Sequence, residues 1–79
     1  MGRPKPHSQD PRVYQIAAHI KKLRIDKGYT SYESFAYDHD LPPIQYWRLE
    51  TGTNFTIASL LKILDVHKIS LKEFFEKLE

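Results

Sequence analysis

The chain has 79 residues, no cysteine and a formal net charge of +2, and 41% of its residues are hydrophobic. This length suits one small domain, and the apolar content is that of a packed chain rather than a disordered one. The lack of cysteine excludes a disulfide framework and a cysteine-based zinc site, and fits a reducing cytoplasm. Without 18 consecutive apolar residues or a signal-peptide pattern, we expect no membrane partner.

The charge is unevenly distributed along the chain. Residues 1–27 carry seven Lys or Arg against two Asp, whereas residues 28–52 carry one Arg against four acidic residues. This asymmetry predicts an anionic partner near the N-terminal part of the chain. The acidic middle segment instead favours a protein partner.

Residues 1–9 are expected to form a flexible basic arm, and residues 10–79 a single domain. The arm contains two Pro, one Gly and polar neighbours without periodicity. Its stretch "GRPKP" resembles part of an AT-hook, which implies that Arg3 and Lys5 contact a DNA minor groove. The alternative is a solvated tail.

The first helix is predicted to begin at Asp10-Pro11, where Asp caps the helix and Pro takes its first position. It should end near Gly28, a residue typical of helix C-termini. Positions at helical spacing predict its inner face, namely Val13, Ile16, Ala17, Ile20, Leu23 and Arg24.

A second helix is predicted from the stretch "TSYE" at residues 30–33, which matches a capping box. In this interpretation Thr30 caps a helix that starts at Ser31. The pattern breaks at Asp40, a residue type that tolerates the left-handed conformation of a tight turn. The predicted inner face consists of Tyr32, Phe35, Ala36 and His39.

The third helix is predicted to start with Pro43, because Pro42-Pro43 forces an extended residue before it. It should run to about Thr51 and stop at Gly52. Two more helices are expected downstream, each with a capping residue, at Thr56 and Ser70. Their apolar positions are Ile57, Leu60, Leu61 and Leu64, followed by Leu71, Phe74, Phe75 and Leu78. The predicted fold is all-α, a compact bundle of about five short helices.

The second and third predicted helices are short and are joined by a tight turn, the spacing typical of a helix-turn-helix unit. The stretch "LRIDKGYTSYESFAYDHDLPPIQYWRLETG" resembles a lambda-repressor/Cro-like (Xre-type) helix-turn-helix domain. In the resemblance Phe35-Ala36 matches the Leu-Ala pair of the first motif helix, and Tyr46 and Leu49 match the two buried positions of the second. It covers about residues 16–76.

This resemblance implies a small bacterial or phage transcriptional regulator, in the simplest case a repressor, that binds specific sequences in double-stranded DNA as a homodimer. The second motif helix enters the major groove and reads bases. The implied base-reading residues are Pro43, Ile44, Gln45, Trp47 and Arg48. The implied phosphate contacts are Ser31, Tyr32, Thr53 and Asn54.

The orientation of Trp47 has two interpretations. If Tyr46 and Leu49 face the core, Trp47 lies on the outer face with Ile44 and Arg48. Alternatively, Trp47 folds back and covers the small core, because aromatic side chains bury large areas when they can.

The sequence contains no pattern that predicts catalysis, a cofactor or a metal site. The four histidines are scattered, and His39 is expected to be a partly buried helix residue rather than a ligand. The alternative to DNA binding is a protein-interaction module, such as an antitoxin or adaptor that keeps the same fold. Apolar residues at the start of the third helix favour this alternative.

Overall fold

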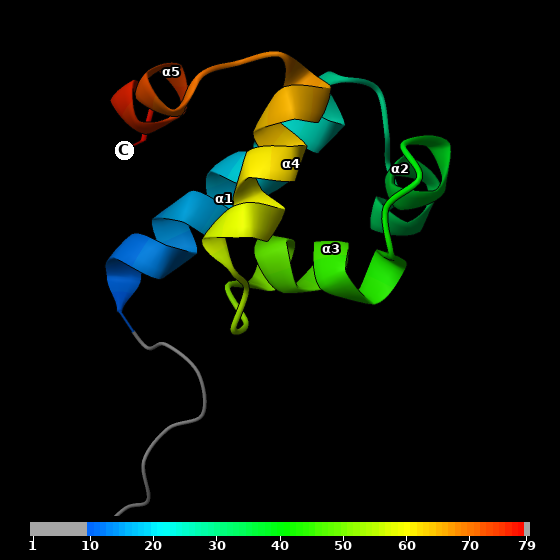
Figure 1. Ribbon diagram of the computed structural model, residues 1–79, viewed down its shortest axis with the longest axis horizontal. Helices are drawn as coiled ribbons and strands as arrows, with labels where there is room; N and C mark the ends of the chain where they lie inside the picture. The colour runs from blue at the N-terminus through cyan, green and yellow to red at the C-terminus, as the bar shows by residue number, and fades with distance from the viewer. Residues whose placement is uncertain (1–9, 79) are drawn as a thin grey trace, which may run out of the picture.

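The computed structural model describes residues 10–78, which form five helices and no strand. The helices are α1 (Pro11–Asp26), α2 (Tyr32–Asp38), α3 (Pro43–Thr51), α4 (Ile57–His67) and α5 (Leu71–Glu76). Helix α3 packs against α1, α2 and α4, and α5 packs against α4 at the end of the molecule opposite α3 (Figure 1). The predicted all-α fold is confirmed. Within the described range, no helix is both long and apolar enough to cross a membrane.

Four of the five helices begin at the predicted residue, and three of these four have the predicted capping side chain. Asp10 accepts a hydrogen bond from the Arg12 backbone N–H, and α1 begins at Pro11 as expected. Thr56 caps α4, and Ser70 forms a complete capping box with Glu73 at the start of α5. The predicted arm with Arg3 and Lys5 lies outside the described residues.

The start of α2 differs from the prediction by one residue. The capping side chain is Ser31, whose hydroxyl accepts hydrogen bonds from the backbone N–H groups of Glu33 and Ser34 at 3.1 and 3.2 Å. Thr30 therefore does not cap the helix, and α2 begins at Tyr32. Two adjacent hydroxyl residues offer two possible caps, and the backbone places Ser31 in the extended conformation that a cap requires.

The core contains buried side chains from all five helices, and Phe35 of α2 is completely buried in it. Its ring stacks on His67 at 5.4 Å between centroids and lies 4.4 Å from the ring of His39 and 5.0 Å from that of Tyr46. His39 is half-buried, as predicted. Burial, and then the charge of Lys27, lower the pKa of His67 to about 4, so this imidazole is neutral in the folded protein near pH 7.

Helix α5 buries less of its apolar stripe than the sequence pattern predicts. Phe74 is completely buried, and Leu78 packs partly against the core. Leu71 and Phe75 are each almost half exposed. Part of the apolar surface of α5 is therefore left uncovered by the rest of the domain.

Candidate nucleic-acid interface

Helix α3 has a buried face and an outer face. Tyr46 and Leu49 are each only 1% exposed, whereas Ile44 is 60% and Trp47 39% exposed. Positions 44, 47 and 48 share one side of the helix because they are three and four residues apart. The structure thus places Trp47 on the outer face with Ile44 and Arg48. Tyr46 is buried in the core.

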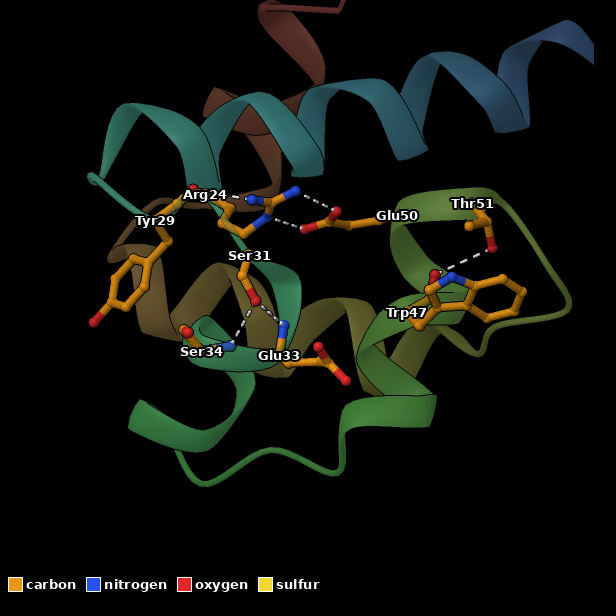
Figure 2. Close-up of polar contacts among 8 residues, drawn as sticks. All are labelled: Arg24, Tyr29, Ser31, Glu33, Ser34, Trp47, Glu50 and Thr51. Carbon is orange, nitrogen blue, oxygen red and sulfur yellow. Dashed lines mark hydrogen bonds and ion pairs between the residues drawn. The ribbon is translucent and has the colours of Figure 1, made fainter.

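The C-terminal part of α3 is fixed to α1 by a buried ion pair. The Nε and Nη2 atoms of Arg24 donate to the two carboxylate oxygens of Glu50 at 2.7 and 3.0 Å (Figure 2). The Nη1 atom donates to the backbone carbonyl of Tyr29 at 2.9 Å. Both charged side chains are less than a tenth exposed. The hydrogen bonds that Arg24 donates to the Glu50 carboxylate raise the pKa of Arg24 further, so its guanidinium stays charged.

This ion pair corrects the charge argument made from the sequence. Arg24 is one of the seven cations of residues 1–27, but it is buried and neutralised by Glu50. Arg12 pairs with Asp10 and Lys22 pairs with Asp26, and these are the two Asp already counted in this segment, so the reduction comes from Arg24. The positive charge available to an anionic partner is therefore smaller than the residue count predicts.

The start of α3 offers few hydrogen-bond donors. Pro42 is the N-cap residue and makes no side-chain cap, and Pro43 occupies the first position. Proline has no backbone N–H, so neither residue can donate. The Tyr46 N–H is already bonded to the Pro42 carbonyl at 3.0 Å. The backbone N–H groups of Ile44 and Gln45 are the donors left in this first turn.

The loop after α3 is organised by Thr51, a residue that the sequence did not single out for this role. Its hydroxyl bonds to the Trp47 carbonyl at 3.1 Å (Figure 2) and lies 2.8 Å from the hydroxyl of Thr53. The Thr53 N–H bonds to the Arg48 carbonyl at 2.9 Å. Asn54 follows with a φ of 46° and is exposed. The spacing of four residues between Trp47 and Thr51 is the signal that could have indicated this contact.

Six of the nine residues predicted for DNA contact in the described range line one open hollow. Its volume is about 480 Å³, and it is bordered by the start of α2, the outer face of α3 and the following loop. The lining residues are Tyr32, Ile44, Trp47, Arg48, Thr53 and Asn54. A smaller neighbouring hollow shares Arg48 and Asn54 and adds Gln45. Ser31 and Pro43 are not part of either.

The remaining two predicted contact residues have structural tasks. The Ser31 hydroxyl oxygen accepts two backbone hydrogen bonds as the cap of α2. Its O–H group can still donate one hydrogen bond. Pro43 is half-buried in the first turn of α3. Among residues 10–78, no group of three or more His, Asp or Glu side chains could hold a metal ion.

Comparison with solved structures finds similarity to a restriction-modification controller protein. The wild-type restriction-modification controller protein C.Esp1396I has 30% sequence identity and a TM-score of 0.69, over 86% of this chain and 90% of that chain. A single-residue variant of it has 31% identity and a TM-score of 0.68, over 85% and 89% of the two chains. No protein-family model matches the sequence, and no curated protein matches it significantly.

Proposed function

Because the chain belongs to the family of the restriction-modification controller protein C.Esp1396I, we propose that it is a transcriptional regulator that binds double-stranded DNA through α3. The observation that carries this proposal is the hollow shared by the start of α2, the outer face of α3 and the next loop. A helix that enters the major groove needs base-facing side chains on its outer face, with phosphate-facing groups on both sides. The hollow contains both kinds of residue.

Each type of residue in the hollow has a chemistry suited to one part of the duplex. Arg48 can donate two hydrogen bonds to O6 and N7 of guanine, and Gln45 can pair with N6 and N7 of adenine. Tyr32, Thr53 and Asn54 carry hydroxyl and amide donors that suit phosphate oxygens. None of these three residues carries a charge. Their phosphate contacts should therefore add little to the dependence of binding affinity on salt concentration.

The finer assignments of the proposal are an Xre-type domain, a homodimer on an inverted repeat, and repression by blocking polymerase. A single short helix reads few base pairs, and two copies related by a twofold axis read two half-sites. The exposed apolar surface of α5 supports a dimer, because Phe75 is exposed beyond what the domain covers.

The proposal is tested by titrating the protein with random duplex DNA at two salt concentrations. The expected result is binding that weakens with salt, with a slope of about −0.9 per neutralised phosphate. Arg48→Ala should weaken binding, whereas Lys72→Ala should not. Lys72 is the matched control, because it is also an exposed cation but lies on α5, away from the hollow.

The result that would refute DNA binding is the absence of any complex at low salt. In that case the protein-interaction module is the better interpretation. The apolar, exposed Ile44 and Trp47 are the residues that would contact a protein partner, and their replacement should then abolish that complex.

A further inference from the structure

We infer that Ile44 and Trp47 make this protein a reader of thymine methyl groups, so that its preferred sites contain thymine at positions facing the first turns of α3. This inference rests on the proposed function and specifies which feature of the duplex the outer face recognises. It depends on the burial pattern of α3 and on the chemistry of its first turn.

The start of α3, from Pro42 to Ile44, carries no polar side chain that could read a base. Pro42 and Pro43 have no N–H and no polar side-chain group, and no side chain caps the helix there. The first outward side chain is Ile44, which is 60% exposed. Residues near the N-terminus of a recognition helix are those that contact base edges. A base that faces Ile44 therefore meets an apolar side chain, and Gln45 is the first polar side chain of the helix.

An apolar side chain in the major groove can recognise the apolar groups of the bases. Each base pair presents hydrogen-bond donors and acceptors there, and the one apolar group among the four bases is the C5-methyl of thymine. Any other base placed against Ile44 would lose water from its polar groups without a replacement partner. Selection against those bases thus adds to the attraction for thymine.

Ile44 has a second apolar side chain beside it on the outer face of α3. Trp47 lies three residues further along on the same side of the helix and lines the same hollow. The two apolar side chains line this hollow together with the polar side chains of Arg48, Thr53 and Asn54. The bordering polar groups can bond to phosphates or neighbouring bases and hold the apolar pair against the methyl groups.

The experiment starts from duplex sites selected by the wild-type protein from a randomised library. Each dT of the selected site is replaced in turn by dU, which removes the methyl group and preserves base pairing. Removing one buried methyl-sized group should lower the affinity roughly fourfold. We expect this loss at one or two positions of each half-site. At these positions 5-methyl-dC should bind better than dC by a similar factor.

Protein variants assign the effect to its residues. Ile44→Ala should bind the dT and dU sites with equal affinity at one position, because the group that contacts the methyl is gone. Gln45→Ala is the matched control and should weaken binding overall while retaining the preference for dT over dU. Circular dichroism melting checks that both exposed substitutions leave the fold intact.

Two results would overturn the inference. If the protein selects specific sites but binds dU sites as well as dT sites, the methyl-reading role is wrong and DNA binding stands. If no site is selected and no duplex is bound, the proposed function fails and the inference fails with it.

Discussion

Glu50→Gln tests whether the buried ion pair positions α3. The substitution keeps the size of the side chain and removes its charge, so Arg24 keeps a buried charge without a carboxylate partner. Arg24 donates to both carboxylate oxygens of Glu50, at 2.7 and 3.0 Å, and the amide of Gln keeps only one of these two acceptors. Removing one partner of a buried pair typically costs about 3–5 kcal/mol. A domain of this length has a free energy of unfolding of about 4–12 kcal/mol, so the loss is a large fraction of the total.

The assay is urea unfolding followed by circular dichroism, together with a thermal melt. For a small domain, each kcal/mol lowers Tm by about 4–8 °C, so a fall of at least about 12 °C is expected. Asp26→Asn is the matched control. It breaks the Lys22–Asp26 pair, in which both side chains are more than half exposed, and should cost less than about 0.5 kcal/mol.

A double variant separates the pair from the two individual residues. Arg24→Met combined with Glu50→Leu leaves no buried charge, so its stability should exceed that of either single variant. Single substitutions that each cost less than about 1 kcal/mol would refute the reasoning. Strict additivity of the two losses would refute it as well, because coupled partners are not additive.

Three further predictions concern the turns, the core and α5. Gly52→Ala should destabilise the protein by about 1–2 kcal/mol in urea unfolding, because φ is 75° and an added Cβ would lie 3.3 Å from Val13. Gly28→Ala is also strained, at φ of 99°, but it has open space around the added Cβ, so it should lack the steric part of the loss, and a larger loss at Gly28 would contradict this. Because the pKa of His67 is about 4 in the folded protein against an ordinary 6.5, stability should fall as pH drops from about 6.5 towards 4. His67→Gln should flatten this pH dependence, and an unchanged slope would exclude His67 as its source. Finally, Phe75→Glu should convert a dimer to a monomer in sedimentation; a wild-type protein that stays monomeric at millimolar concentration would remove the basis for the dimer.

The helices could be predicted from the sequence because their signals are local. Asp10, Thr56 and Ser70 cap the helices that they were expected to cap. The turn at Asp40 has the expected left-handed conformation, with φ of 59°. The cap of α2 was misplaced because Thr30 and Ser31 are adjacent and chemically alike, and the path of the chain decides between them.

The parts of the site that depend on distant contacts could not be predicted in the same way. Arg24 and Glu50 are 26 residues apart. No local sequence pattern could therefore show that Arg24 is buried in an ion pair and does not contribute to the positive surface. The orientation of Trp47 was also left open, between the outer face and a position folded back over the core. The packing of the whole domain decides it, because the core is filled by residues such as Tyr46 and Phe35 and leaves Trp47 39% exposed.

The division of α3 into two faces also affects how such a protein can diverge over time. Its buried face carries Tyr46 and Leu49, while the Glu50 carboxylate is bound to α1. Its exposed positions, which are Ile44, Gln45, Trp47 and Arg48, contribute little to the core, so substitutions there should change stability only slightly. Descendants of this chain can therefore exchange their outer residues and acquire new recognition preferences without first passing through unstable intermediates.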